Sequence, residues 1–212
     1  PARVSPPHGW VGHIPFGATL VKSLQPSTLV ELGTHTGNSY FAFCQAVKES
    51  GLKTKCYAID TWRGEPHAGF YDDSVFHEVK RYNETHYQEF SHLLRTTFNE
   101  AAATFDDVSI DLLHIDGLHT YEAVKEDYTT WLPKVRDGGC ILFHDICEKK
   151  GDFGVWKLWE EIQQNNEHTF SFSHSHGLGA LVKGDAPVQN EFLAALMREE
   201  YTQAWQQIFA KA

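Results

Sequence analysis

The sequence predicts an α/β fold: a mainly parallel sheet with helices on both faces and an antiparallel hairpin near the C-terminus. Short apolar runs alternate with amphipathic segments over most of the chain, which is the pattern of strand–helix–strand units. Several of these runs end in glycine or acidic residues. The last two apolar runs flank a glycine-rich turn within 168–184, which is typical of a hairpin.

The size and charge of the chain limit its function. Its 212 residues suit a single domain, expected to span 1–212 and to be excised from a longer chain, since Met197 is the only methionine. The net charge of −10 argues against a nucleic-acid partner. No apolar run approaches the ~20 residues of a membrane span. The four cysteines form no CxxC pair, which favours reduced thiols and a cytoplasmic location.

The first part of the chain predicts two buried strands joined by a helix. The strands are "TLVELG" (28–33) and "KCYAID" (55–60), and "SYFAFCQAVKES" (39–50) has the pattern of an amphipathic helix between them. An earlier helix, "IPFGATLVKSL" (14–24), is placed so that it can cover a ligand. His8 and His13 precede this helix and are expected at the surface.

The rest of the chain continues the alternation after a long insert. Residues 61–91 are polar and aromatic and are expected to be part loop and part helix. The remaining strands are expected at 92–98, 110–116 and 140–146, with helices at 99–105, 120–135 and 155–165. The hairpin of 168–184 is expected to turn at Gly177–Gly179. A last helix, 189–211, closes the chain.

Polar residues follow the strands where a parallel sheet binds its ligands. In such sheets, ligands lie outside the carboxyl ends of the strands. The segments that end there are Glu31–Gly37, Asp60–Trp62, Asp116–His119 and His144–Asp145. We therefore expect one site at this edge of the sheet.

The first of these segments favours a nucleoside without phosphates. The loop reads G-x-x-x-G, and His35 stands where a dinucleotide motif has its middle glycine. A Walker loop is absent. Asp60 ends the second strand and can accept hydrogen bonds from both hydroxyls of a ribose. Trp62 is expected to pack against an adenine.

Four motifs together resemble the class I S-adenosylmethionine-dependent methyltransferases: "ELGTHTGNS", "AIDTW", "LLHIDGLHTYEAV" and "GGCILFHDI". They are most similar to the small-molecule O-methyltransferase branch often found beside or fused to glycosyltransferases. The resemblance covers roughly 10–184, with a cofactor half to about 110, a catalytic half beyond it and an extra C-terminal helix. It implies a Rossmann-like fold with a seven-stranded sheet. The residues implied to bind the cofactor are Glu31, Gly33, Thr34, Gly37, Ser39, Asp60 and Trp62.

The resemblance also implies a metal-assisted acceptor site. Catechol-type and macrolide-sugar O-methyltransferases hold a divalent cation with an acid and a pair of oxygen-bearing residues after the next strand. Here these positions are Asp116, His144 and Asp145. The histidine departs from the all-oxygen pattern and shifts the expected ion from Mg²⁺ towards Mn²⁺. His119 is expected to be the general base beside Asp116, because an imidazole titrates near neutrality.

Each motif also has a structural interpretation. The two glycines can mark a turn that binds nothing, and Asp60 can be only a turn residue. Asp116 and Asp145 can be helix or turn caps, and His119 can be a loop histidine. His174 and His176 are expected to be hairpin-end residues, and Trp156, Trp159 and Ile162 to be core packing. The expected function is O-methylation of a hydroxyl on a sugar, glycan or glycosylated small molecule. A phenolic acceptor and a non-catalytic cofactor-binding module are the alternatives.

Overall fold

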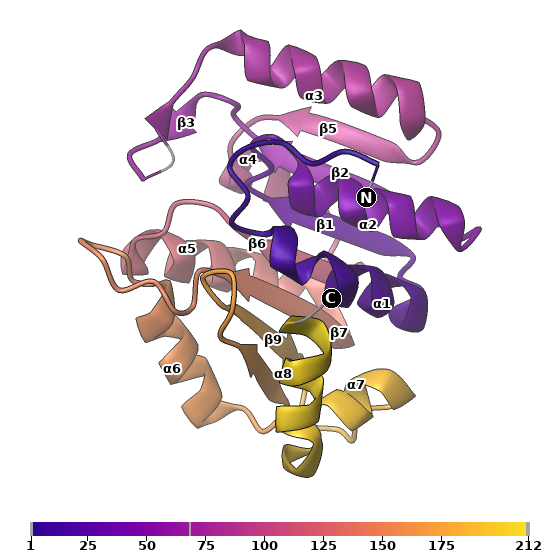
Figure 1. The fold of residues 1–212 in the computed structure, drawn as a ribbon, viewed down its shortest axis with the longest axis vertical. Helices are drawn as coiled ribbons and strands as arrows, with labels where there is room; N and C mark the ends of the chain where they lie inside the picture. Colours follow the sequence, from indigo (N-terminus) through magenta and orange to yellow (C-terminus); the bar gives the residue numbers. More distant parts are fainter. Residues whose placement is uncertain (1, 68, 211–212) are drawn as a thin grey trace.

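The computed structural model describes residues 2–67 and 69–210, and a sheet of seven strands forms its centre (Figure 1). The strand order is β5-β2-β1-β6-β7-β9-β8. The strands are β1 (Thr28–Leu32), β2 (Lys55–Asp60), β5 (Ser91–Arg95), β6 (Ile110–Ile115), β7 (Val135–His144), β8 (Thr169–Phe172) and β9 (Leu178–Val182). The first five are parallel, whereas β9 pairs antiparallel with both β7 and β8. The predicted Rossmann-like sheet with its terminal hairpin is confirmed.

Helices cover both faces of this sheet. On one face lie α1 (Ile14–Leu24), α2 (Asn38–Glu49), α3 (Asp73–His86), α7 (Glu191–Leu196) and α8 (Thr202–Ala210). On the other lie α4 (Phe98–Ala102), α5 (Tyr121–Trp131) and α6 (Val155–Asn165). Side chains alternate along a strand, so Leu29 of β1 joins the first hydrophobic cluster and Val30 the second. Single 3₁₀ turns occur at Val11–His13, Leu132–Lys134 and Glu199–Tyr201.

The strand order reverses at the centre of the sheet. The chain runs from β1 outward through β2 to β5 and then crosses back to β6 on the opposite side of β1. In register, Leu32 lies opposite Ile115. The Asp116 N–H donates to the Leu32 carbonyl at 2.8 Å, so the loops that follow both strands leave the sheet side by side. Such a switch point is where this class of sheet binds ligands.

The insert of 61–91 holds a small hairpin as well as the expected helix. Gly64–Glu65 (β3) pairs antiparallel with Gly69–Phe70 (β4), and α3 follows. The hairpin was not predicted, because two-residue strands carry no periodicity. The third predicted strand, 92–98, is really Ser91–Arg95. It ends early because Thr97 caps α4 and pairs with Glu100 in a capping box.

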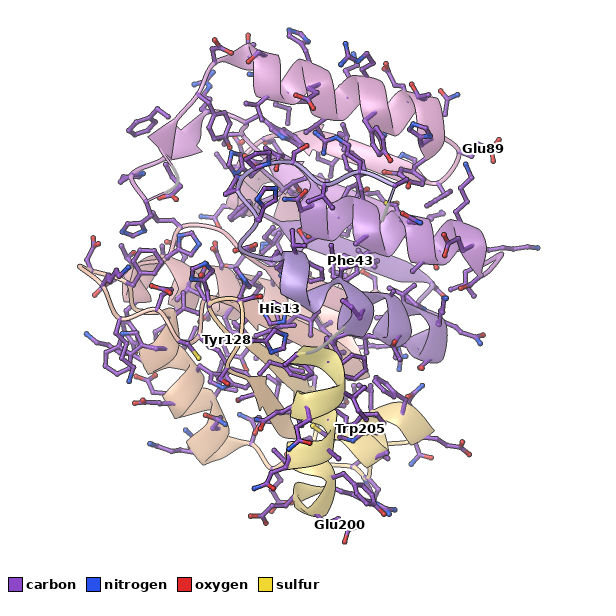
Figure 2. The ribbon with its side chains drawn as sticks, in the orientation of Figure 1. His13, Phe43, Glu89, Tyr128, Glu200 and Trp205 are labelled. Atoms are coloured by element: carbon purple, nitrogen blue, oxygen red, sulfur yellow. The ribbon has the colours of Figure 1, made fainter. Side chains whose placement is uncertain are left out.

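Two predictions about the C-terminal region are wrong. Gly179 lies within β9, opposite Phe143, and the hairpin turn occupies 173–177 instead. Gly179 is needed because an added Cβ would lie 2.7 Å from the Trp159 ring. The single last helix of 189–211 is interrupted: α7 ends at Leu196, and α8 begins at Thr202. The Trp205 indole N–H of α8 donates to the Ala195 carbonyl of α7 at 3.1 Å and joins them (Figure 2).

The final predicted residue, 211, lies outside the described residues. In the described ranges, no helix combines the length and apolar character needed to cross a bilayer.

Candidate active site

A cavity of about 1130 Å³ opens at the carboxyl ends of the central strands. Its walls include the predicted strand-end residues Gly33, Asp60, Asp116, His119, His144 and Asp145. The N-terminal segment 7–10 and the β3–β4 insert complete the walls. Ligand cavities commonly measure 300–1,000 Å³, so this one has room for two small molecules side by side. The predicted convergence of the strand ends is confirmed.

The two glycines of the first loop are required by the backbone. Gly33 has a φ of +84°, and an added Cβ would lie 2.0 Å from the Asp116 carbonyl oxygen. Gly37 has a φ of +83° and precedes α2, whose N-terminus receives no side-chain cap from the residues that the structure describes. Asn38 and Ser39 from the first turn of α2 line the cavity, as does Thr34 in the loop. This loop therefore presents backbone and small polar groups to a ligand.

Asp60 fastens the glycine loop to the end of β2. Its Oδ2 accepts the backbone N–H groups of Thr34 at 2.9 Å and His35 at 2.8 Å, and its Oδ1 accepts that of Trp62 at 2.7 Å. A carboxylate has about four acceptor sites, so one is left for an outside donor. The carboxylate also lines the cavity. Asp60 therefore has one acceptor site left for a donor in the cavity, whereas the sequence predicted an acid free to accept both hydroxyls of a ribose.

The expected contact between Trp62 and an adenine is wrong. Trp62 has a φ of +49°, and its ring is fully buried against Phe76, with centroids 5.0 Å apart. Its indole N–H donates to the His35 carbonyl at 2.9 Å. An aromatic pair that does line the cavity is His35 and Tyr71, stacked at 4.8 Å. Tyr71 lies in the insert, where no sequence spacing pointed to it.

Glu31 was expected to bind the cofactor. It lies beneath the loop, is fully buried and is not part of the cavity wall. The Trp10 indole N–H donates to His114 Nε2 at 3.1 Å, which leaves the imidazole proton on Nδ1. That Nδ1–H donates to Glu31 Oε2 at 2.8 Å. Burial raises the pKa of Glu31, while His114 and then Ser39 lower it. Sequence reasoning missed Trp10 and His114, although His114 lies directly opposite Glu31 in register.

Asp116, His144 and Asp145 meet at the predicted place. His144 Nδ1 lies 3.3 Å from Asp116 Oδ1 and 3.1 Å from Asp145 Oδ2. His144 Nε2 lies 3.0 Å from the Ser175 carbonyl, which can only accept, so Nε2 carries a proton. Nδ1 therefore faces two carboxylates and needs either a second proton or a cation there. The donor set and its spacing fit a divalent cation.

The same carboxylates determine the charge of His119. Burial by itself lowers the pKa of an imidazole, but the neighbouring carboxylates of Asp116, Asp145 and Glu65 raise that of His119 to about 12. The pKa of His144 is raised to about 10 in the same way. Burial raises the pKa of Asp145, and the two histidines outweigh this and lower it to about 2. The expectation that His119 titrates near neutrality is therefore wrong for this arrangement.

The other histidines near the site are only partly as expected. His176 is a hairpin-end residue, and its Nδ1 lies 2.6 Å from Glu148 Oε1. His13, expected at the surface, is fully buried, and its Nε2 donates to the Ser175 carbonyl at 3.2 Å. His8 and His176 line the cavity.

Solved methyltransferases share this fold. The Podospora anserina methyltransferase PaMTH1, solved with S-adenosylhomocysteine, aligns with a TM-score of 0.63 at 11% identity, over 82% of this chain and 78% of that one. The O-methyltransferase TomG of Streptomyces achromogenes, solved with S-adenosylmethionine, gives 0.57 at 18% identity, over 86% and 82%. At such identities the likeness concerns the fold alone.

Two curated proteins are similar to this chain in sequence, and their names state no activity. Uncharacterized protein y4gI of Sinorhizobium fredii (strain NBRC 101917 / NGR234) is 46% identical over 184 residues, which are 87% of this chain and 20% of that protein. Uncharacterized protein R132 of Acanthamoeba polyphaga mimivirus is 29% identical over 124 residues, 56% of this chain and 51% of that protein. The chain therefore spans about a fifth and a half of their lengths.

A family model described as a methyltransferase domain matches residues 30–146. This match covers more than half of the chain and contains the glycine loop, Asp60, and the group of Asp116, His144 and Asp145. The chain belongs to the methyltransferase domain family.

Proposed function

We propose that this chain transfers the methyl group of S-adenosylmethionine to a hydroxyl oxygen of a sugar, glycan or glycosylated small molecule. The observation that carries the proposal is a single cavity lined by two chemically different groups of residues, which we call its first and second ends. One end has the glycine loop and Asp60, and the other has Asp116, His144 and Asp145. Membership of the methyltransferase domain family supports this interpretation.

The first end suits the cofactor. Gly33, Thr34 and Ser39 line the cavity with backbone and hydroxyl groups, so they are proposed to hold its methionine part, together with Gly37, which follows Thr34 in the same loop. Asp60 has one acceptor site left for a ribose hydroxyl. The stacked rings of His35 and Tyr71 replace Trp62 as the proposed aromatic neighbours. TomG and PaMTH1 were solved with such cofactors, which supports the choice.

The second end suits an acceptor hydroxyl. Asp116, His144 and Asp145 are proposed to hold a divalent cation, and their mixed nitrogen and oxygen donors favour Mn²⁺ over Mg²⁺. When bound, such an ion would lower the pKa of the acceptor hydroxyl. The Asp116 carboxylate would orient that hydroxyl and take its proton as the oxygen attacks the methyl carbon in line; the carbon–sulfur bond breaks, and S-adenosylhomocysteine leaves. His119 Nε2 lies 3.0 Å from Asp145 Oδ2, so we assign it as a positioning residue instead of a neutral base.

The walls of the second end favour a polyhydroxylated acceptor. Imidazole, carboxylate and ammonium groups surround it, contributed by His8, Glu148, Lys150 and His176. These groups match the many donors and acceptors of a sugar. Phe153 adds an apolar ring, which a phenolic acceptor would also use. An association with a glycosyltransferase is proposed from the resemblance of the motifs.

The test is a turnover assay with a panel of acceptors. We expect S-adenosylhomocysteine to accumulate with glycosides or sugar nucleotides, and to a smaller extent with catechols. Asp116→Asn should reduce the rate at least 100-fold, since a positioned catalytic contact typically contributes this much. Asp106→Asn, at an exposed position, is the matched control. Tight cofactor binding without turnover on any acceptor would favour the non-catalytic module.

A further inference from the structure

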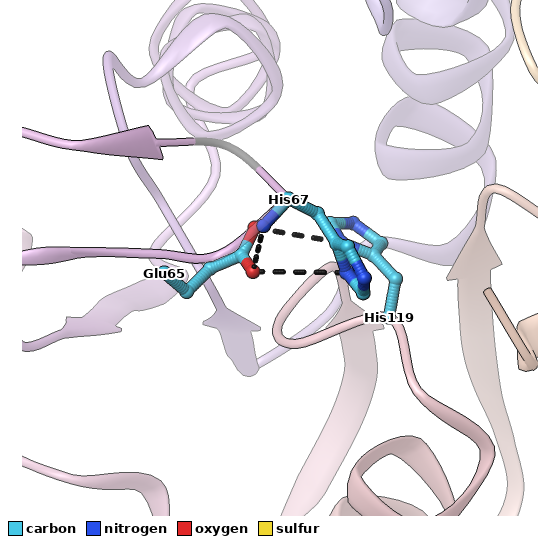
Figure 3. A group of neighbouring side chains, drawn as sticks. All are labelled: Glu65, His67 and His119. Atoms are coloured by element: carbon cyan, nitrogen blue, oxygen red, sulfur yellow. Dashed lines mark hydrogen bonds and ion pairs between the residues drawn. The ribbon is translucent and has the colours of Figure 1, made fainter. Parts of the chain in front are cut away.

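A second group of metal-ligating side chains lies beside the first and comes largely from the insert. Glu65 on β3 and His67 in the turn after it meet His119 (Figure 3). One donor atom from each residue lies within 4.8 Å of the others. The three side chains are 22%, 13% and 14% exposed.

Two separations within this group, one from each carboxylate oxygen of Glu65, are close to those of ligands around a shared ion. Glu65 Oε1 lies 3.6 Å from His119 Nδ1, and Glu65 Oε2 lies 3.7 Å from His67 Nδ1. Both distances are too long for a hydrogen bond, although Glu65 Oε2 does accept the backbone N–H of His67 at 2.7 Å. Two ligands bound at about 2.1 Å to a tetrahedral ion lie about 3.4 Å apart. The observed spacing needs only a small contraction to close on such an ion.

The protons of both imidazoles are placed for metal binding. His67 Nε2 lies 2.7 Å from Asp152 Oδ1, and His119 Nε2 lies 3.0 Å from Asp145 Oδ2. Since a carboxylate accepts, each Nε2 carries a proton, and each Nδ1 is turned towards Glu65. Within the described ranges, neither Nδ1 has a hydrogen-bond partner, and both are buried. A metal-ligating histidine usually donates its other ring N–H to a carboxylate in this way.

One aromatic ring holds both imidazoles in position. Phe153 packs against His67 at 4.4 Å and stacks on His119 at 5.0 Å with an angle of 17°. Phe153 and Asp152 belong to the loop before α6, so three separate segments converge on this point. An apolar ring beside the donors limits solvent access, which strengthens their interaction with a cation.

We propose that Glu65, His67 and His119 bind a divalent transition-metal ion of the Zn²⁺ type, separate from the site at Asp116, His144 and Asp145. Two imidazole nitrogens and one carboxylate oxygen suit Zn²⁺ and not Mg²⁺ or Ca²⁺. Three protein ligands leave one position of a tetrahedral ion for water or an acceptor oxygen. The ion fastens the β3–β4 hairpin to the loop after β6 and so fixes the wall of the cavity. This assignment does not depend on methyl transfer.

The test measures Zn²⁺ binding to the chelator-treated chain by calorimetry. The absorption spectrum of bound Co²⁺, in place of Zn²⁺, reports on the ligands of the site. We expect His67→Gln to weaken one Zn²⁺ site at least 100-fold. Asp152→Asn removes only the carboxylate behind His67 and should weaken the same site 10–100-fold. His77→Gln, at an exposed position on α3, should bind as the parent does.

A double variant, Asp116→Asn with His144→Gln, separates the two sites. It should retain the Zn²⁺ affinity and the Co²⁺ spectrum that His67→Gln loses. The affinity of His67→Gln for S-adenosylhomocysteine should be unchanged, which distinguishes failure of this proposal from failure of the proposed function. Equal Zn²⁺ binding by the parent and His67→Gln would overturn the assignment, as would a parent that binds no Zn²⁺. Either result would leave Glu65 as an ion-pair partner of protonated imidazoles.

Discussion

His114 Nδ1–H donates to Glu31 Oε2 at 2.8 Å, across the boundary between two neighbouring parallel strands. Both side chains have no exposed surface. The Trp10 indole holds the other imidazole nitrogen at 3.1 Å and so fixes the tautomer. The N-terminal segment thus reaches through His114 to the carboxylate beneath the glycine loop.

Removing His114 should therefore destabilise the chain. His114→Leu leaves the Glu31 carboxylate buried without its hydrogen-bond donor, which we expect to cost about 3 kcal/mol of unfolding free energy. Urea denaturation measures this, with His77→Leu on the surface of α3 as the control. Adding Glu31→Leu to His114→Leu should recover part of the loss, because it removes the unpaired group. A change below 1 kcal/mol in the single variant would contradict the assigned pair.

The sequence predicted the sheet and the binding edge because both follow from local patterns. Apolar runs such as 28–33 and 110–116 read directly as buried strands, and parallel strands necessarily present their carboxyl ends together. Asp116 and Asp145 therefore met as expected. The order of the strands in the sheet, by contrast, depends on residues far apart in the sequence. The pairing of Glu31 with His114 needed the register of β1 against β6.

Side-chain direction after a strand end was the harder problem. Asp60 and Trp62 are two residues apart, yet Asp60 lines the cavity and Trp62 turns into the core, because its φ is positive and its N–H binds Asp60. The sequence of the insert did not predict a role for Glu65 or His67. Glu65 belongs to a two-residue strand and His67 to the turn after it, so no periodicity marks either residue.

Asp60 should affect the cofactor through the loop as well as directly. Asp60→Ala frees the N–H groups of Thr34 and His35 and removes the acceptor that we propose for the ribose. We expect at least tenfold weaker binding of S-adenosylhomocysteine by calorimetry, since a hydrogen bond to a charged group is worth roughly 1.5–3 kcal/mol. Asp60→Asn keeps one acceptor oxygen and should lose less. Parental affinity in Asp60→Ala would remove Asp60 from the proposed cofactor site.

The donor set at the second end should control the choice of ion. Chelator treatment should abolish turnover, and Mn²⁺ should restore it better than Mg²⁺. His144→Asp replaces the only nitrogen donor of the set by oxygen, so the ratio of Mg²⁺-supported to Mn²⁺-supported rate should rise by about tenfold. His174→Asp, which changes a neighbouring histidine outside the set, should leave the ratio as it is. Full activity in chelator-treated protein would assign the three residues a structural role.

His13 should make the fold sensitive to mild acid. Burial, and then the neighbouring His144 and His174, lower the pKa of His13 to about 3, whereas an unfolded histidine has a pKa near 6.5. Between these values the unfolded chain binds one proton that the native chain does not, so the unfolding free energy falls as the pH falls. From pH 7.5 to 5.5 this loss is about 1.4 kcal/mol.

The raised pKa values of His119 and His144 act in the opposite direction, so the comparison must be between variants and not between pH values alone. His13→Gln retains an N–H donor for the Ser175 carbonyl but does not titrate. Urea denaturation at both pH values should show that this variant gains about 1.4 kcal/mol relative to the parent on going from pH 7.5 to 5.5. His77→Gln should follow the parent. If the difference between His13→Gln and the parent is the same at both pH values, His13 keeps an ordinary pKa in the native state, and the protonation of other groups governs acid sensitivity.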